Sequence, residues 1–401
     1  MAIPRVKPGN HPAFLSYGFR PFFLAGALYG ALAIAFWLPL LYGRVETQSV
    51  LAPVDWHSHE MLFGYLPAIV TGFLLTAIPN WTGRLPVQGS PLLLLLLLWV
   101  AGRFAVFFSG SIGWLAVAAI DNAFLTAVVA AAAAEIIAGR NWRNLKVLLP
   151  LIALLLANVL FDVEIGLAGS PDLSPRLALA AAVMLIVIIG GRIIPSFTHN
   201  WLVRENPGRL PQPFGRFDVA LIASTALALA AWVFRPDWPG TGAASLFAAL
   251  GNAIRLARWA GDRTVRDPLV LVLHLAFAFV PVGFAIIGLA ALLPELIPAV
   301  AGVHAFGVGA IGSMTLAVMV RATLGHTGHP LRAGPATCLI FAAVMLSALL
   351  RVLAAFYPGS IILLHGSALF WCIAFLGYAL VFGGMLLKPR MRTQQTDGGR
   401  S

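Results

Sequence analysis

The chain has 401 residues, of which 60% are hydrophobic and only 10% are charged. A soluble protein carries about 25% charged residues, so this composition excludes an ordinary soluble domain and indicates an integral membrane protein. The formal net charge of +11 does not indicate a nucleic-acid-binding protein, because the Lys and Arg residues are scattered through short loops. The two cysteines, Cys338 and Cys372, lie far apart within apolar stretches, which argues against a disulfide framework or a CxxC metal site.

The apolar pattern predicts an all-α integral membrane protein with about twelve transmembrane helices, because a spanning helix needs about 20 mostly apolar residues. The predicted spans are residues 19–42, 59–79, 90–109, 112–138, 144–162, 175–195, 216–234, 241–259, 268–293, 297–320, 334–356 and 360–387. The eighth span is the most polar of them, since it carries Asn252, Arg255 and Arg258.

Basic residues concentrate in every second loop, and the loops between them are mainly acidic. The basic group consists of Arg5, Lys7, Arg140, Arg143, Lys146, Arg204, Arg209, Arg216, Arg263, Arg266, Arg332, Lys388, Arg390 and Arg392. The positive-inside rule assigns these loops to the cytoplasm. We therefore expect one transmembrane domain over residues 1–401, with cytoplasmic tails at 1–18 and 388–401. No small-residue cleavage site follows the first basic residues, so we expect no cleaved signal peptide.

Three similar helix ends recur every four spans: IPNWTG (78–83), IPSFTH (194–199) and TLGHTG (323–328). Spans 2 and 10 each run 25 residues from an outer histidine, His59 or His304, to a Thr-Gly pair. That length corresponds to roughly 36 Å of helix, about one bilayer. The pattern predicts three repeats of four helices around a pseudo-threefold axis along the membrane normal. Coincidence is the alternative, because Thr-Gly is a common helix stop.

The topology brings four histidines to the outer side of the membrane: His57, His59, His304 and His365. A histidine from span 2 facing one from span 10 is what a six-coordinate haem requires. His57 and His59 would diverge by about 200° on a helix, so both can bind one metal only if the chain is extended there. We expect Glu60 or Asp55 to accept the second N–H of such an imidazole. His365 is a candidate copper ligand, and a hydrated polar rim is the alternative for this group.

A second group of histidines, His199, His326 and His329, lies at the inner helix ends and is a candidate for another metal or haem site. Its alternative is a solvated rim. Arg103 and Arg351 lie within spans 3 and 11 on the outer side, where a buried charge needs a partner. Haem propionates are one candidate, because guanidinium binds carboxylates bidentately, and snorkelling to the interface is the other.

Other polar residues lie inside the predicted spans. Asp121 and Asn122 in span 4 and Asn158 in span 5 indicate either a water or proton route or hydrogen bonds between helices. His274 is expected to be a hydrogen-bonded core histidine.

Five stretches of the sequence carry a resemblance to a known family. They are GFRPFFL (18–24), WHSHEMLFGY (56–65), GFLLTAIPNWTG (72–83), GGRIIPSFT (190–198) and HAFGVGAIGSMTLAVMVRATLGHTG (304–328). With these motifs the chain resembles the NnrS family, bacterial membrane proteins linked to the nitric oxide response and described as containing haem and copper. The resemblance implies a haem b- and copper-containing protein of the bacterial inner membrane that helps cells to tolerate nitric oxide, with nitric oxide as its ligand.

The chain is more distantly similar to the catalytic subunit of haem–copper oxidases and nitric oxide reductases, in which spans 2 and 10 hold the low-spin haem. Carried over, the matching ligands are His59, or His57, and His304. The chain departs from that pattern because span 6 has only His199, at its inner end, and span 7 has no histidine where three copper ligands are expected. An oxidoreductase acting on nitric oxide is therefore one expectation among several.

Two further functions are compatible with the sequence. One is a membrane transporter or ion pathway without redox chemistry, because internal repeats and proline-interrupted helices are also transporter features. The other is a cofactor-assembly protein, with histidines near the surface as transient ligands. The bilayer is the one partner that the sequence indicates, and no electron donor is suggested.

Overall fold

The computed structural model describes residues 11–391, and within that range it contains helices and no strands. The outer parts of both predicted tails, residues 1–10 and 392–401, lie outside the described residues. Among residues 11–391, eleven helices are long and apolar enough to cross a membrane. They are α1 (Phe19–Leu41), α2–η2–α3 (Pro53–Thr82), α4 (Ser90–Phe107), α6 (Trp114–Ala138), η3–α7 (Trp142–Ala168), α8–η4–α9 (Leu173–Glu205), α10 (Arg216–Phe234), α12 (Pro268–Leu292), α13–η6–α14 (Ala299–Thr327), α15 (Pro335–Phe356) and α16 (Ile361–Leu387). The segments of the composite helices are α2 (Pro53–His59), η2 (Glu60–Tyr65), α3 (Leu66–Thr82), η3 (Trp142–Val147), α7 (Leu148–Ala168), α8 (Leu173–Leu185), η4 (Ile186–Gly190), α9 (Gly191–Glu205), α13 (Ala299–His304), η6 (Ala305–Gly312) and α14 (Ser313–Thr327).

The eighth predicted span is the helix α11 (Pro239–Ala257), which packs against α10 and α12 but is not among the eleven. Its polar residues face protein. Arg255 Nε donates to Asp218 Oδ1 at 3.0 Å, and Asn252 Nδ2 donates to Thr225 Oγ1 at 3.0 Å. Eleven of the twelve predicted spans are thus confirmed by length and composition, and the remaining one is a helix whose polar residues are sequestered against its neighbours. The shorter elements are η1 (Ala13–Leu15), α5 (Ser109–Ile112) and η5 (Gly261–Arg263).

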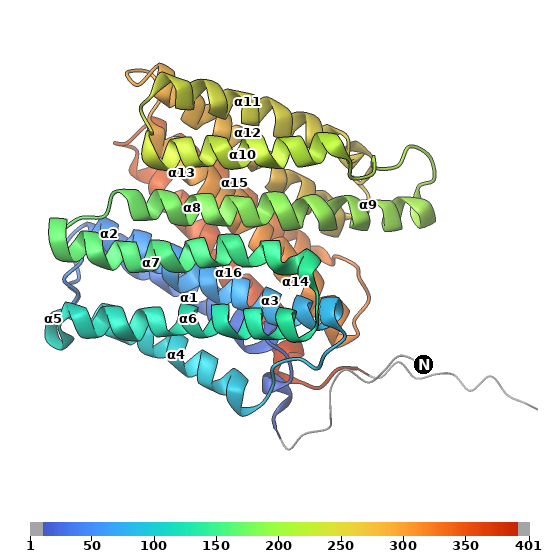
Figure 1. Ribbon diagram of the computed structural model, residues 1–401, viewed down its shortest axis with the longest axis horizontal. Coiled ribbons are helices and arrows are strands. Elements are labelled where there is room, and N and C mark those ends of the chain that lie inside the picture. The colour runs from blue at the N-terminus through green and yellow to red at the C-terminus, as the bar shows by residue number, and fades with distance from the viewer. Residues whose placement is uncertain (1–10, 392–401) are drawn as a thin grey trace, which may run out of the picture.

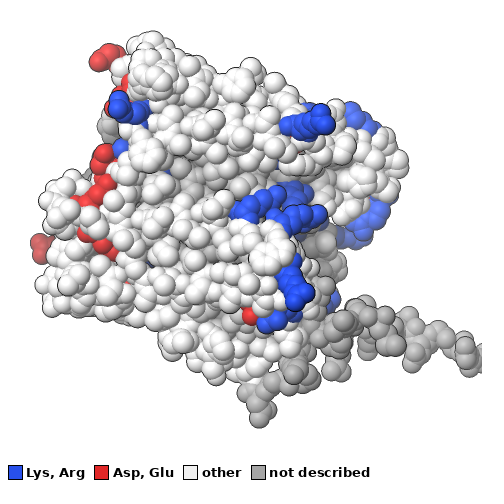
Figure 2. Space-filling view, viewed as in Figure 1, with Lys and Arg blue, Asp and Glu red and all other residues white. Residues whose placement is uncertain are grey.

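The two ends of the helix bundle carry opposite charge. Figure 2 shows that most Lys and Arg side chains on this face gather at one end and most Asp and Glu side chains at the other. We call these the basic end, which includes Arg143, Lys146 and Arg209, and the acidic end, which includes Glu46, Asp172 and Glu295. This segregation is the structural form of the alternating loop charges in the sequence.

Three continuous helices form the centre of the bundle, and they are the predicted spans 2, 6 and 10. Their apolar windows are 78%, 61% and 67% buried, respectively. α12 reaches 61%, whereas the other seven spans are only 33–44% buried. In Figure 1, α8 and α9 run through the middle of the molecule, between α10–α12 on one side and α6–α7 on the other.

Two of the central helices share an irregularity at matching positions. In each of them an α-helical segment ends at the outer histidine, His59 or His304, and a π-helical segment follows directly. These segments are η2 (Glu60–Tyr65) and η6 (Ala305–Gly312). π-Helical turns are rare and occur frequently at functional sites, so their agreement supports the alignment of spans 2 and 10.

The inner ends of the three central helices also match. The aligned Thr82, Thr198 and Thr327 each donate a side-chain hydrogen bond to the carbonyl four residues earlier, at 2.9, 2.8 and 2.6 Å. Gly83 and Gly328, at aligned positions, terminate α3 and α14 in the left-handed conformation, with φ of 73° and 83°. The Thr-Gly pairs thus end both helices in the same way, with a threonine hydrogen bond followed by a left-handed glycine. The arrangement of three whole repeats stays a prediction.

Candidate functional site

His59 lies in a buried charge cluster that consists of His59, Glu60, Arg103 and Asp121. The imidazole is fully buried, with Nδ1 3.1 Å from Glu60 Oε1 and Nε2 3.4 Å from Asp121 Oδ2. Arg103 closes the ring, because one terminal nitrogen donates to Glu60 Oε2 at 2.6 Å and the other donates to Asp121 Oδ1. Spans 2, 3 and 4 are therefore joined by charged groups in the interior of the bundle.

Further polar groups complete the buried charge cluster. Tyr29 on α1 donates to Glu60, and Asn158 on α7 donates to Asp121 Oδ2 at 2.8 Å. Two glycines make room for the charges: a Cβ on Gly64 would lie 2.6 Å from an Arg103 terminal nitrogen, and a Cβ on Gly102 would lie 2.7 Å from Asp121 Oδ1. Side chains larger than glycine at these two positions would collide with the cluster.

The charge balance of the buried charge cluster depends on the histidine. Glu60 and Asp121 carry two negative charges against one on Arg103, so a proton on His59 makes the cluster neutral. Uncompensated charge is costly in a buried site, which favours such pairing. Both ring nitrogens of His59 face carboxylates, Nδ1 that of Glu60 and Nε2 that of Asp121. The expected role of Glu60 or Asp55 toward a metal-bound imidazole stays a prediction. His59 as an axial ligand stays a prediction.

A second group, which we call the outer histidine pair, consists of His57 and His304. Each is partly buried and, within the described part of the chain, neither has a hydrogen-bond partner. They lie within electrostatic reach of one another and of Arg351 on α15. The His57 ring also stacks on Trp37 of α1, with centroids 4.2 Å apart.

The helix α2 (Pro53–His59) explains why the two span-2 histidines have different surroundings. Because residues 57 and 59 are both helical, their side chains point to different neighbours, and the extended chain needed for one shared metal is not present. His59 meets the acids of spans 2 and 4, whereas His57 meets Trp37 and lies near His304. The sequence register alone favoured His59 as the partner of His304, whereas in the structure it is His57 that lies within electrostatic reach of His304.

The remaining predicted site residues are dispersed. His365 is exposed on α16, where its ring stacks on Tyr42 with centroids 5.6 Å apart. His329 Nδ1 lies 2.8 Å from Thr327 Oγ1 at the end of its own helix. His199 and His326 line one cavity at the basic end, and His329 is not among its lining residues. In the part of the chain that the structure describes, no three His, Cys, Asp or Glu side chains gather in a way that could hold a metal ion. Metal ligation by these histidines stays a prediction.

The other polar residues inside the spans make hydrogen bonds between helices. Asn158 donates to Asp121, and Asn122 Nδ2 donates to Asp162 Oδ2 at 2.5 Å. His274 is buried, with Nδ1 3.1 Å from the Val270 carbonyl and Nε2 3.3 Å from Thr198 Oγ1. It is the hydrogen-bonded core histidine that the sequence predicted.

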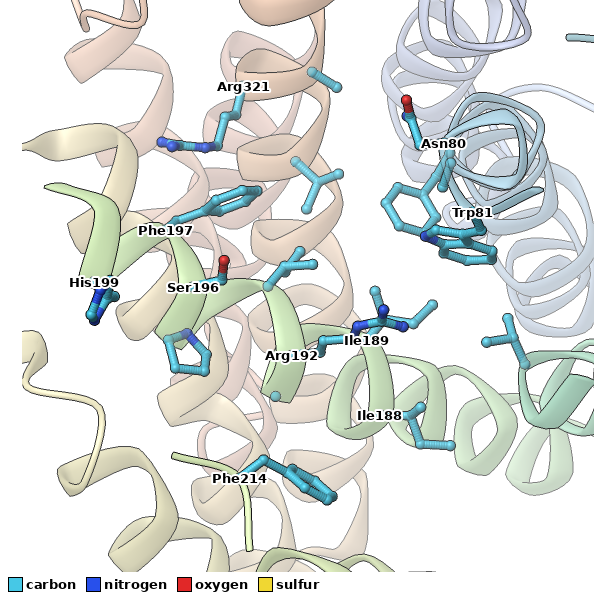
Figure 3. Close-up of a pocket in the computed structure, with 18 of the residues that line it drawn as sticks. Asn80, Trp81, Ile188, Ile189, Arg192, Ser196, Phe197, His199, Phe214 and Arg321 are labelled. Atoms are coloured by element: carbon cyan, nitrogen blue, oxygen red, sulfur yellow. The ribbon is translucent and has the colours of Figure 1, made fainter. Parts of the chain in front are cut away.

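The cavity at the basic end was not predicted from the sequence. It has a volume of about 1070 Å³ and lies where the inner halves of α3, α9 and α14 meet the connection that contains Phe214. Figure 3 shows Asn80 and Trp81 on one side of it and Arg192, Ser196 and Phe197 on another. The signal that could have found it is the set of three similar helix ends, because all three contribute residues to its wall.

Comparison with known proteins bears on the chain as a whole. The family model described as NnrS protein matches residues 13–390, which is nearly the whole chain. No curated protein matches the chain. The match covers the central helices, the buried charge cluster, the outer histidine pair and the basic-end cavity. The chain therefore belongs to the NnrS family.

Proposed function

We propose that this NnrS-family membrane protein binds haem b and contributes to the response to nitric oxide or to tolerance of it. Its place would be the bacterial inner membrane, with both termini in the cytoplasm, as the charge of the basic end favours under the positive-inside rule. The observation that carries the proposal is the outer histidine pair, two imidazoles from central helices without hydrogen-bond partners in the described residues.

The chemistry of these residues fits a haem. Two neutral imidazoles are a common axial ligand set, and a guanidinium such as that of Arg351 suits a carboxylate-bearing cofactor. In this proposal His57 and His304 hold the iron, and Arg351 binds a propionate. A bound haem would supply a redox-active iron, and nitric oxide would bind to it only by displacing one of the two imidazoles. Copper nearby is part of the proposal, with His365 as its candidate ligand, and the enzymatic use of nitric oxide is left to experiment.

We also propose that spans 1–4, 5–8 and 9–12 are three repeats about an axis along the membrane normal. The matching π segments of the second and tenth spans support this arrangement, as do the three threonine hydrogen bonds and the shared cavity. The repeat explains why a ligand pair would come from spans 2 and 10, which hold equivalent places.

The test is the haem content of purified protein, measured from the Soret band and the pyridine haemochrome. We expect wild-type protein to contain haem, and His57→Ala and His304→Ala to lose most of it. His365→Ala is the matched control for haem content, because this exposed histidine stacks on Tyr42 and is proposed as a copper ligand rather than a haem ligand. His59→Ala tests the alternative that His59, which is aligned with His304 in the sequence, is the ligand. Haem loss in His59→Ala, with haem retained in His57→Ala, would assign the ligand to His59. Wild-type protein without a Soret band would refute the proposal.

A transporter is the second candidate function, favoured by the large cavity between central helices at one end of the bundle. Counterflow in proteoliposomes by protein that contains neither haem nor copper would favour this candidate over the first.

A further inference from the structure

The basic-end cavity has a layered wall in which the three central helices contribute residues at aligned positions. One layer consists of Trp81, Phe197 and His326. The second layer, which begins five residues earlier on each helix, consists of Thr76, Arg192 and Arg321. These residues are equivalent in the register of the IPNWTG, IPSFTH and TLGHTG endings. Each layer combines one residue from each central helix, as the proposed repeat requires, and connecting segments around residues 143–147 and 210–214 complete the wall.

The cavity wall is strongly cationic. Arg143, Lys146, Arg192 and Arg321 line it, and none of the four forms an ion pair within the described residues. Arg192 donates to the Asn144 side chain at 3.0 Å, and Arg321 lies over the Phe197 ring at 4.0 Å. Arg321 also interacts at longer range with Asp267, a carboxylate that does not line the cavity. The net positive charge of the wall attracts anions into the cavity.

The acidic group in the wall does not compensate this charge. Asp218 is the one carboxylate among the lining residues in the described part of the chain. Its oxygens accept from Arg255 Nε at 3.0 Å and from the Gly215 amide at 3.0 Å. Asp218 is therefore already paired with an arginine outside the wall, Arg255, and the wall keeps its net positive charge.

The rest of the wall is aromatic and aliphatic. Trp81 and Phe197 face the space in Figure 3, and Phe214, whose side chain is 60% exposed, lies at its edge. Arg143 and Arg192 are also exposed, so a ligand can reach the guanidinium groups from the basic end. A small hydrated anion would leave the aromatic surface unused, whereas an apolar molecule would leave the cations unpaired.

We propose that this cavity binds an anionic amphiphile, a molecule with a carboxylate or phosphate group on an apolar body. Arg192 and Arg321 take the acid group, since guanidinium binds both of these acids through paired hydrogen bonds. Trp81 and Phe197 pack against the apolar body. The ligand comes either from the leaflet at the basic end, as an anionic lipid, or from the aqueous phase, as a single-chain acid. This site lies at the opposite end of the central helices from the outer histidine pair.

The experiment uses the full chain in phosphatidylcholine nanodiscs, with 9,10-dibromostearate as the probe and its methyl ester as the uncharged comparison. Bromine quenches tryptophan at short range, and the signal of a Trp81→Phe variant is subtracted to isolate quenching of Trp81. We expect saturable quenching by the acid and much weaker quenching by the ester. The Arg192→Gln/Arg321→Gln variant should bind the acid about tenfold more weakly or worse, because two charge-assisted contacts are lost.

The matched control is Arg140→Gln, because Arg140 is an exposed arginine of the basic end that does not line the cavity. It should bind the probe like wild type. Equal affinity of the double variant and wild type, or of ester and acid, would overturn the proposal. If the double variant does not fold, Arg192→Gln and Arg321→Gln are measured singly, with the same criterion.

A further arm distinguishes the two sources of the ligand. Nanodiscs that contain phosphatidylglycerol should weaken probe binding if an anionic lipid occupies the cavity, and unchanged binding assigns the site to a single-chain acid. Haem content is recorded for every variant. Haem loss in the double variant together with normal probe binding would overturn the proposal and would assign the two arginines to the cofactor instead.

Discussion

Replacement of Arg103 by methionine tests whether the buried charge cluster holds spans 2, 3 and 4 together. The guanidinium is 8% exposed, and it donates to carboxylates that are each 1% exposed. Arg103→Met would leave Glu60 and Asp121 buried with one imidazole between them. Removing one partner of a buried ion pair costs about 3–5 kcal/mol. At roughly 2 °C per kcal/mol for a large domain, the unfolding midpoint should fall by about 6–10 °C.

The assay is thermal unfolding of the purified protein in a neutral detergent. A triple variant, Glu60→Gln/Arg103→Met/Asp121→Asn, removes the stranded charges as well and should recover much of the loss. Arg84→Gln is the control, because Arg84 pairs with Glu135 at 2.7 Å in an exposed setting and its loss should leave the midpoint close to that of wild type. The reasoning is refuted if Arg103→Met melts with the wild type, or if the triple variant is less stable than the single one.

Two further predictions follow from the same structure. Gly64→Ala should destabilise the protein by about 1–3 kcal/mol in the same assay, because the new Cβ would lie 2.6 Å from an Arg103 nitrogen. Gly307→Ala, which meets nothing within 4 Å, is its control, and equal midpoints for the two variants would contradict the packing argument. The charge of the basic end predicts a cytoplasmic C-terminus, so a C-terminal green fluorescent protein fusion should fluoresce and an alkaline phosphatase fusion should be inactive. The reverse pattern would show that the orientation is wrong.

The helices and their charged ends could be predicted from the sequence because both follow from composition along the chain. The lengths of the apolar stretches indicated where the spans begin and end. The eighth predicted span was the most polar of the twelve, and the same polar residues exclude α11 from the helices that are apolar enough to cross a membrane. The alignment of spans 2 and 10 was also readable, because repeated endings at equal spacing reflect equal helix lengths. These features depend on local sequence and need no knowledge of neighbours.

The neighbours of each histidine could not be predicted. An alignment along a helix gives the depth of a residue, and His59 and His304 are aligned in depth. The direction of a side chain changes by about 100° from one residue of a helix to the next. Which neighbours a side chain meets therefore depends on how the helix is rotated about its own axis in the bundle. The sequence therefore could not say that His59 meets Asp121 and that His57 lies near His304. The basic-end cavity could not be predicted for a similar reason, because it depends on the distances between three helices in the bundle.

The π segments η2 and η6 affect how the two halves of each helix are oriented relative to one another. Each separates an outer half, which carries a histidine, from an inner half, which lines the basic-end cavity. A π turn is wider than an α turn and alters the angular phase of everything beyond it. The outer half can therefore direct its histidine in one direction while the inner half directs its cavity-lining side chains in another. A single helix can in this way serve two independent sites, and selection can tune one end of the membrane protein without disturbing the other.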